Sequence, residues 1–295
     1  FALTSLKFTG FWNLHATKYD YVFCLGDRFE MAGAVLSGIP FGVRFAHLHG
    51  GETTLGAIDN VYRHCISLAS SLHFVSTEDF KKRIKELTGE NESCYVVGSL
   101  SLDTLSQMKY LSLDEFKAKW SIDLSTPTIL VTVHPETIEF QMNPYFAEQI
   151  TKALKTLSEI SQVVITMPNA DTGGMVFREQ FNELKCQFPS RIHLIENFGK
   201  RSYFSCLKYA DHLIGNTSSG LIEAASFQKF VVNVGNRQKG RLSGNNIIHV
   251  PFRSEEIVKA SRMVSGRIYN GSNIYYQINP AQQIIEVLKV EHDRL

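Results

Sequence analysis

The segment from Tyr21 to Arg63 reads YVFCLGDRFEMAGAVLSGIPFGVRFAHLHGGETTLGAIDNVYR, and it decides the fold class. It begins with an apolar run, YVFCLG, that is typical of a buried strand and is followed by Asp27 and Arg28. An apolar helical stretch comes next, and then a second strand that ends in HLHGGE. Two strands separated by a helix indicate a βαβ unit with parallel strands. Their carboxyl ends meet at one edge of the sheet, which is where open α/β sheets place their active sites.

The same alternation of strand and helix continues along the rest of the chain. In the first half, strand-like runs cover 21–25, 43–48, 72–76 and 94–98. In the second half, they cover 128–134, 163–168, 191–197, 212–216, 229–235 and 246–252. Helical patterns lie between these runs, as in proteins with parallel sheets. The pattern predicts an α/β protein made of two Rossmann-like domains that face each other across a cleft.

A less regular stretch, residues 109–127, separates the two sets and is interpreted as the interdomain link. We therefore expect an N-terminal Rossmann-like domain over residues 1–120 and a nucleotide-binding Rossmann-like domain over residues 121–295. The last predicted helix, 280–290, could pack on either domain. Because the first strong strand begins only at Tyr21, we expect the N-terminal domain to lack its first strands in this sequence.

The composition is that of an ordinary globular protein. The chain has 295 residues, of which 44% are hydrophobic and 20% are charged, and this length suits two domains better than one. Its net charge of +1 gives no support for binding to nucleic acid or to a membrane surface through bulk electrostatics. No apolar run is long enough to span a bilayer. Five scattered cysteines without a CxxC pair favour buried thiols in a reducing cytoplasm over disulfides or a metal site.

A polar segment in the second half indicates an anion-binding site. In DHLIGNTSSGLIEAASF, the residues Thr217, Ser218, Ser219 and Gly220 fall at the start of a predicted helix. Backbone N–H groups and the helix dipole favour a phosphate there, although an ordinary N-cap would need only one such residue. Glu223, one turn later, could accept hydrogen bonds from ribose hydroxyls or could simply be solvated.

Other strand ends in the second half carry polar side chains whose roles stay open. His134, in VTVHPET, could contact a phosphate or a sugar, or could be structural. Asn169 lies in the turn-rich segment MPNAD, which could also be a plain loop. Arg237, in GNRQKGR, either reaches the same rim or belongs to a solvated basic loop. The occurrence of one polar cluster per strand end in both halves is a stronger signal than any one of these residues.

The opening segment supplies candidate acid–base groups. Its predicted strand ends carry three carboxylates and two histidines, namely Asp27, Glu52, Asp59, His47 and His49. Paired acids can act as general acid and base once their surroundings separate their pKa values. A metal could bind the same groups, but His47 and His49 alternate along a strand and would point to opposite faces, which disfavours a shared metal. The carboxylates could also be structural and pair with Arg63.

Seven motifs in chain order carry a resemblance to a known family. They are LGDRFEM, AHLHGGETTLGAIDNVYRHCISLASSLHFVSTE, VGSLSLDTL, VTVHPET, MPNAD, IGNTSSGLIEAASF and VNVGNRQKGR. The first three are similar to the first domain of the UDP-N-acetylglucosamine 2-epimerases, and the last four are similar to the second. The resemblance covers nearly the whole chain and is strongest to the hydrolysing branch, which makes N-acetylmannosamine for sialic acid and its relatives. It implies a GT-B-like fold that binds a nucleotide sugar in the cleft and needs no cofactor and no metal.

The resemblance also implies roles for individual residues. The implied catalytic set is Asp27, His49, Glu52, Asp59 and His134. The implied substrate-binding set is Arg28, His134, Asn169, Phe198, Thr217, Ser218, Ser219, Gly220, Glu223 and Arg237. In this set, Arg28 would reach the diphosphate, Phe198 would lie against the uracil, and Glu223 would accept from the ribose. The chain departs from the family at His49, where other members have a catalytic Glu, so His49 and Glu52 both remain candidates for the acid or base.

The implied reaction eliminates UDP across C1 and C2 and then adds water to the resulting glycal. Inversion at C2 needs proton-transfer groups on both faces of the ring, and we expect Asp27, His49 and Asp59 to supply them, with Glu52 in reserve. The alternatives are a non-hydrolysing epimerase, a hydrolysing enzyme for UDP-diacetylbacillosamine or GDP-N-acetylglucosamine, a GT-B glycosyltransferase, and a nucleotide-sugar-binding module. The expected partner is the nucleotide sugar, and apolar helices at the start and around Ile66 suit a homodimer or a dimer of dimers.

Overall fold

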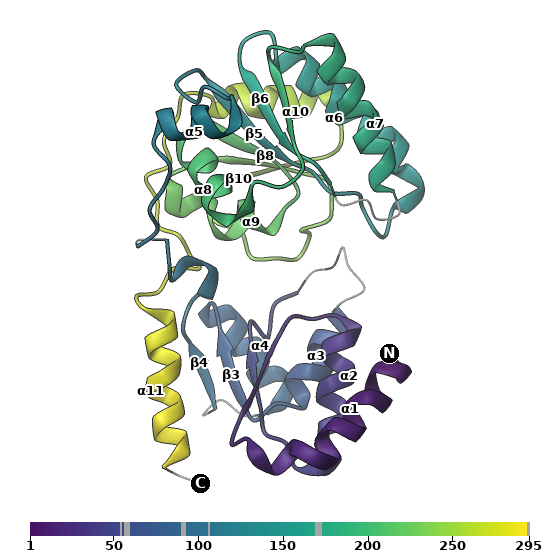
Figure 1. Cartoon of the computed structure of the whole chain (residues 1–295), viewed down its shortest axis with the longest axis vertical. Coiled ribbons are helices and arrows are strands. Elements are labelled where there is room, and N and C mark those ends of the chain that lie inside the picture. Colours follow the sequence, from purple (N-terminus) through teal and green to yellow (C-terminus); the bar gives the residue numbers. More distant parts are fainter. Residues whose placement is uncertain (54, 56–59, 90–92, 106, 169–172, 294–295) are drawn as a thin grey trace. The chain divides into compact units, whose positions relative to one another are not determined.

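The computed structural model describes residues 1–53, 55, 60–89, 93–105, 107–168 and 173–293. It divides into two compact units (Figure 1). The first unit comprises Phe1–Ser106 and Ile274–Leu295, and the second comprises Gln107–Asn273. This division differs from the predicted boundary at residue 120, because the stretch before that residue belongs to the second unit and the end of the chain returns to the first.

The first unit is a four-stranded parallel sheet in the order β1-β2-β3-β4. Its strands are β1 Val22–Leu25, β2 Phe45–Leu48, β3 Leu72–Val75 and β4 Cys94–Val96. Its helices are α1 Ala2–His15, α2 Phe29–Gly38, α3 Asn60–Leu68, α4 Glu78–Thr88 and α11 Pro280–His292, with short 3-10 turns η1 Ala16–Lys18, η2 Ile39–Phe41 and η3 Leu100–Leu102. The predicted alternation of strands and helices is confirmed in this unit.

Alternate side chains of β2 enter two different cores, as expected for a strand that is covered on both faces. Phe45 packs with Trp12 of α1 and Ile66 of α3. Leu48 packs on the other face with Ile284 of α11. Figure 1 shows α11 running beside β4, and its Glu291 accepts a hydrogen bond from Tyr95 at 3.1 Å. The last helix therefore completes the core of the first unit.

The second unit is a six-stranded parallel sheet in the order β10-β9-β8-β5-β6-β7. Its strands are β5 Thr128–Thr132, β6 Gln162–Thr166, β7 Ile192–Ile195, β8 His212–Gly215, β9 Val231–Val234 and β10 Ile247–Val250. Its helices are α5 Leu113–Trp120, α6 Asn143–Leu157, α7 Gly174–Gln187, α8 Gly199–Tyr209, α9 Ser218–Ile222 and α10 Ser254–Val264, with 3-10 turns η4 Phe140–Met142 and η5 Ala224–Phe227. The chain runs outward from β5 through β6 to β7 and then restarts at β8, so the strand order reverses between β5 and β8, where ligands bind in such sheets.

The segment before α5 belongs to the second unit because of its contacts. The N–H of Leu111 donates to Ser205 Oγ of α8 at 2.9 Å, and Arg201 donates to the Lys109 carbonyl at 2.7 Å. Phe116 of α5 is fully buried and packs against Phe198. The stretch interpreted as a link is thus part of a folded unit. Among the described residues, no helix is both long and apolar enough to cross a membrane.

A buried row of polar side chains crosses the sheet of the first unit. Cys24, His47, His73 and Cys94 are in register on the four strands, and all four are less than 5% exposed. Burial lowers the pKa of His47 to about 3 and that of His73 to about 4, because a charged imidazole loses its hydration there. Burial also raises the pKa of both thiols to about 11. The row is therefore uncharged at neutral pH.

We expect the first unit to lose stability as the pH falls below about 6.5. The histidine pKa values are depressed in the folded protein, so protons bind preferentially to the unfolded chain, and the stabilisation present above pH 6.5 is lost toward pH 4. Each histidine contributes a slope of up to about 1.4 kcal/mol per pH unit. Urea unfolding at several pH values measures this slope, and His73→Leu should flatten it, whereas His292→Gln on the surface should not. If the pH dependence of the free energy of unfolding were unchanged in His73→Leu, it would not arise from this buried histidine.

Candidate functional site

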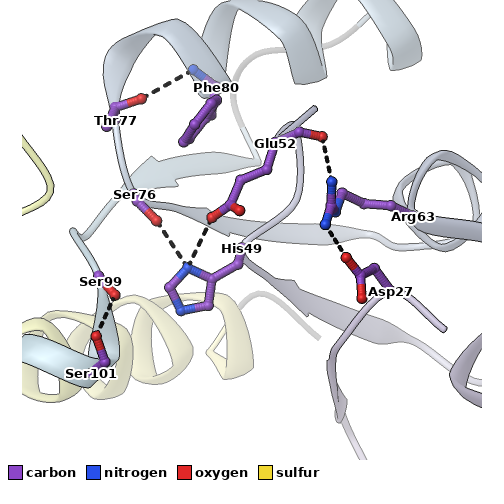
Figure 2. A network of polar contacts seen from close by, with 9 residues as sticks. All are labelled: Asp27, His49, Glu52, Arg63, Ser76, Thr77, Phe80, Ser99 and Ser101. Carbon is purple, nitrogen blue, oxygen red and sulfur yellow. Dashed lines mark hydrogen bonds and ion pairs between the residues drawn. The ribbon is translucent and has the colours of Figure 1, made fainter. Parts of the chain in front are cut away.

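A buried arginine joins the ends of β1 and β2 in the first unit (Figure 2). The side chain of Arg63, on α3, is 4% exposed, and its Nη2 forms an ion pair with Asp27 Oδ2. Its Nη1 donates to the main-chain oxygen of Glu52 at 3.0 Å. A charge buried to this degree is tolerated only when it is paired and hydrogen-bonded. Arg63 thus fixes Asp27 relative to Glu52 and favours the ionised carboxylate, which is the form that can take up a proton.

His49 lies beside Glu52 and contacts a residue that no sequence pattern indicated. Its Nδ1 is 2.9 Å from Ser76 Oγ and 3.6 Å from Glu52 Oε1 (Figure 2). Ser76 follows β3, so this contact joins the carboxyl ends of two neighbouring strands. Ser76 and Glu52 are buried, whereas the His49 side chain is 22% exposed, which leaves part of the imidazole accessible to a ligand.

The loop that carries His49 has a backbone that few residues tolerate. His49 has a φ of 62°, in the left-handed region that histidine enters more readily than most side chains. Gly51 follows with a φ of 78°, and a Cβ atom there would lie 2.5 Å from the carbonyl oxygen of Phe80 in α4. The glycines of HLHGGE therefore let the loop approach the first turn of α4. This approach holds His49 at the end of β2.

The other predicted residues of the first unit stand apart from these contacts. The side chain of Arg28 is 70% exposed and forms a surface ion pair with Glu30 at 3.3 Å, so its contact with a diphosphate stays a prediction. Asp59 lies outside the described residues. His47 bonds Ser67 Oγ at 3.1 Å in the core, so it has a different partner from His49, as the alternation along the strand predicts.

The second unit contains a cavity of about 470 Å³ at the carboxyl ends of β5, β6 and β8. This volume lies within the range of small-molecule sites, and the position is the one where the strand order reverses. Five of the predicted binding residues line it, namely His134, Phe198, Ser218, Ser219 and Glu223. The cavity thus unites residues that are almost 90 positions apart in the sequence.

An aromatic side chain forms one wall of the cavity. Phe198 is 6% exposed, and its ring lies edge-on to Trp120 with the centroids 4.8 Å apart. Phe116 packs against the same ring at 5.6 Å. A ring held on two sides keeps its orientation and offers an apolar surface to a planar base.

Tyr203 also lines the cavity, although nothing in the sequence pointed to it. Its hydroxyl lies near Ser219 and Thr132, and burial raises the pKa of Tyr203 to about 12, so the phenol stays protonated. Ser219 lines the same cavity, so the structure places two hydroxyl-bearing residues beside the space that a ligand would occupy.

Two buried polar side chains tie together the loops beside the cavity. Asn216 accepts from the N–H of His134 at 2.7 Å and donates to its carbonyl at 2.8 Å. Glu136 Oε1 accepts from the N–H groups of Asn236 and Arg237, each at 2.9 Å. Burial raises the pKa of Glu136 even though these N–H groups lower it. Arg237 is thus fixed beside the cavity but is not one of the residues that line it.

The helix predicted from Ser218 is short, because α9 ends at Ile222 and continues as the 3-10 turn η5. Thr217 Oγ1 accepts from the N–H of Ser219 at 3.3 Å, and the N–H of Gly220 donates to the Thr217 carbonyl at 3.2 Å. These bonds are those of the ordinary N-cap that the sequence left open. A Cβ atom at Gly220 would lie 2.9 Å from Leu213, so the glycine allows α9 to pack closely on the sheet. Anion binding by this turn stays a prediction.

The described residues therefore form two chemically different sets. The first unit brings together carboxylates, an imidazole and a guanidinium, which suit proton transfer. The second unit offers a cavity with hydroxyls, a carboxylate and an aromatic wall, which suits a nucleotide. Asn169 lies outside the described residues. In the part of the chain that the structure describes, no group of three or more His, Cys, Asp or Glu side chains could hold a metal ion.

Comparison with protein sequences shows which proteins this chain is similar to. The family model described as UDP-N-acetylglucosamine 2-epimerase matches residues 7–289. A GDP/UDP-N,N'-diacetylbacillosamine 2-epimerase (hydrolyzing) from Campylobacter jejuni is 36% identical over 245 residues, which are 83% of this chain and 64% of that protein. A UDP-N,N'-diacetylbacillosamine 2-epimerase (hydrolyzing) from Legionella pneumophila is 33% identical over 271 residues, 92% of this chain and 71% of that protein. The chain thus spans about two thirds of the length of these relatives.

Comparison with solved structures shows the same fold. The S. aureus MnaA–UDP co-structure has a TM-score of 0.81 at 17% identity and covers 100% of this chain and 79% of its own. The UDP-GlcNAc 2-epimerase from Neisseria meningitidis bound to UDP-GlcNAc has a TM-score of 0.80 at 17% identity, with coverages of 97% and 80%. These likenesses confirm the predicted GT-B-like α/β class with two parallel sheets. With a family model that matches almost the whole sequence, the chain belongs to the UDP-N-acetylglucosamine 2-epimerase family.

Proposed function

We propose that this protein is a hydrolysing nucleotide-sugar 2-epimerase, which converts a UDP-linked 2-acetamido sugar and water to UDP and the free sugar inverted at C2. The observation that carries the proposal is the polar network of the first unit, in which Asp27, Glu52 and His49 are held near one another at strand ends. Carboxylates and imidazoles are the side chains that most often transfer protons near neutral pH. The relatives named as hydrolysing enzymes support the same reaction type.

The reaction begins when a base removes the proton from C2 of the sugar. The electron pair of that C–H bond forms a C1–C2 double bond, and the bond between C1 and the diphosphate oxygen breaks. Water then supplies a hydroxyl group to C1 of the glycal, and a proton reaches C2 from the opposite face. Two ring faces require at least two proton-transfer groups, and we assign them to Asp27 and His49, with Glu52 in reserve. The family resemblance adds Asp59 as a further acid.

The cavity of the second unit supplies the groups that bind the nucleotide in this proposal. Its Phe198 wall suits a uracil ring, and Glu223 can accept hydrogen bonds from ribose hydroxyls. The hydroxyls of Tyr203 and Ser219, together with His134, can donate to phosphate oxygens. Donors that are fixed before the reaction stabilise the charge that develops on the leaving diphosphate.

We propose two candidate sugars for this reaction. UDP-N-acetylglucosamine would give N-acetylmannosamine, the product expected for the sialic acid branch. The names of the relatives support UDP-N,N'-diacetylbacillosamine as a second candidate. Both sugars carry an acetamido group at C2, so one mechanism serves both.

The products formed without an acceptor test the proposed function. We expect purified protein with either UDP-sugar to release UDP and the free 2-epimeric sugar, which NMR distinguishes by the coupling between H1 and H2. An epimer that is still attached to UDP would show a non-hydrolysing enzyme. No reaction with either UDP-sugar would favour a glycosyltransferase or a binding module, and would contradict the proposal.

Replacing Asp27 tests the acid–base network. Asp27→Asn should lower the rate of UDP release by at least about 100-fold, because an amide cannot take up a proton, while the affinity for UDP stays within about twofold. The same result is expected for Asp59→Asn. Thermal unfolding shows whether the loss of charge beside Arg63 has destabilised the fold. Asp20→Asn, which changes a carboxylate that is 68% exposed, is the matched control and should turn over normally. Near-normal turnover in Asp27→Asn would remove this residue from the mechanism.

Replacing Glu223 tests the nucleotide cavity. Glu223→Gln should weaken UDP binding about tenfold, because hydrogen bonds that involve a charged group are worth about 1.5–3 kcal/mol and the amide keeps only part of them. Calorimetric titration with UDP measures the change, and Glu159→Gln, at an exposed position just after α6, serves as control. If Glu223→Gln bound UDP as tightly as the unchanged protein, the ribose would have to bind elsewhere.

A further inference from the structure

Ser76 contacts His49 but has no part in the reaction described so far. We propose that Ser76 is a positioning residue, which holds the His49 imidazole with the proton on Nδ1 and leaves Nε2 free to exchange a proton with the sugar. This inference rests on the proposed function, since it concerns the same proton transfer.

The backbone and the ring of His49 are both tied to β3. The N–H of His49 donates to the carbonyl of Phe74 at 2.9 Å, and its Nδ1 is 2.9 Å from Ser76 Oγ. Ser76 itself is 1% exposed, so its hydroxyl has little freedom to move. Thr77, which follows, accepts from the N–H of Phe80 and caps α4. The serine therefore stands on a rigid corner between a strand and a helix (Figure 2).

The position of the neighbouring carboxylate favours a proton on Nδ1 of the ring. Glu52 Oε1 faces the same Nδ1 at 3.6 Å, and an ionised carboxylate can only accept. A hydrogen atom on Nδ1 can be donated to Ser76 Oγ, and it also carries positive charge on the side of the ring that faces Glu52. The neutral imidazole then has its lone pair on Nε2. An imidazole with its lone pair on Nε2 is the form of the base that can take up a proton.

Because His49 has an unusual backbone conformation, its ring needs the contact with Ser76 to keep its position. At a φ of 62° the strand has ended, and a loop residue of this kind is held only by what surrounds it. Without the Ser76 hydroxyl, the ring would keep only the longer contact with Glu52. A misplacement of about 1 Å at a reacting group can cost about 100-fold in rate.

The same strand provides a matched control. His47, two residues before His49, bonds Ser67 Oγ through its Nδ1 at 3.1 Å, and both residues are fully buried. This second serine–histidine pair has the same chemistry but belongs to the core of the first unit. Removing each hydroxyl in turn therefore separates an effect on the reaction from an effect on the fold.

The first test compares Ser76→Ala, Ser76→Thr and Ser67→Ala. Ser76→Ala should lower kcat about 10- to 100-fold and leave KM and the affinity for UDP within about twofold. Ser76→Thr keeps the hydroxyl and should restore most of kcat. Ser67→Ala should keep kcat within about threefold of the value for the unchanged protein, even if it lowers Tm. A normal kcat in Ser76→Ala, or an equal loss in Ser67→Ala, would overturn the inference.

The second test is a double-mutant cycle with His49. If Ser76 acts through the imidazole, Ser76→Ala should cause no further loss in a His49→Ala background. A full additional loss in that background would show that Ser76 acts independently of His49, and the inference would be wrong.

A spectroscopic measurement keeps this inference separate from the proposed function. In ¹⁵N-labelled protein, the imidazole signals of His49, assigned by comparison with His49→Ala, should show a protonated Nδ1 that changes in Ser76→Ala. If the unchanged protein released no UDP from either UDP-sugar, the proposed function would fail, while the spectra would still show whether Ser76 holds the ring. Identical His49 signals with and without the hydroxyl would overturn the inference.

Discussion

The candidate acid–base site depends on the buried guanidinium of Arg63. Transfer of such a charge out of water costs several kcal/mol even after the protein relaxes, and the ion pair with Asp27 and the bond to the Glu52 main chain offset that cost. Removal of one partner of a buried pair typically destabilises a protein by about 3–5 kcal/mol. The arginine lies on α3, whereas its partners Asp27 and Glu52 follow β1 and β2. The contact between Arg63 and Asp27 is therefore needed both for folding of the unit and for the position of the Asp27 carboxylate. Folding of the first unit and assembly of its polar network are therefore coupled.

In the second unit, hydrogen bonds to main-chain groups hold the described loops beside the cavity. Its loops after β5, β8 and β9 are joined by the amide of Asn216 and by the carboxyl of Glu136, each of which bonds main-chain groups of another loop. Side chains on loops are precise only when a rigid frame holds the backbone, and these bonds supply that frame. His134 lines the cavity from a loop held in this way, and Ser219 lines it from the start of α9. The contrast fits the proposed division of roles, in which one unit moves protons and the other binds a nucleotide.

The strands and their order of appearance could be predicted from the sequence, because buried parallel strands such as Phe45–Leu48 are short apolar runs between turn residues. The domain boundary could not be predicted, because both Phe116 and Ile284 are apolar residues of predicted helices. Only long-range packing shows that Phe116 belongs to the second unit and Ile284 to the first. His134, Ser218 and Ser219 were expected to bind substrate and do line the cavity, since polar residues that follow strands stand out in the sequence. Tyr203 and Ser76 were not, because a tyrosine within a helix and a serine before an N-cap have many ordinary roles. The left-handed backbone of His49 also had no local signal, since it follows from the approach of the loop to α4.

In the proposed reaction, nucleotide departure and inversion at C2 are two parts of one elimination and hydration. Turnover of a UDP-linked 2-acetamido sugar in D₂O, followed by NMR and mass spectrometry, tests it most directly. We expect free UDP together with a free 2-epimeric sugar that carries one deuterium at C2, because the proton that is removed differs from the one that returns. A free sugar that keeps its original hydrogen and configuration at C2 would show simple hydrolysis. A deuterated sugar that remains attached to UDP would show epimerisation without hydrolysis, and either result would contradict the account.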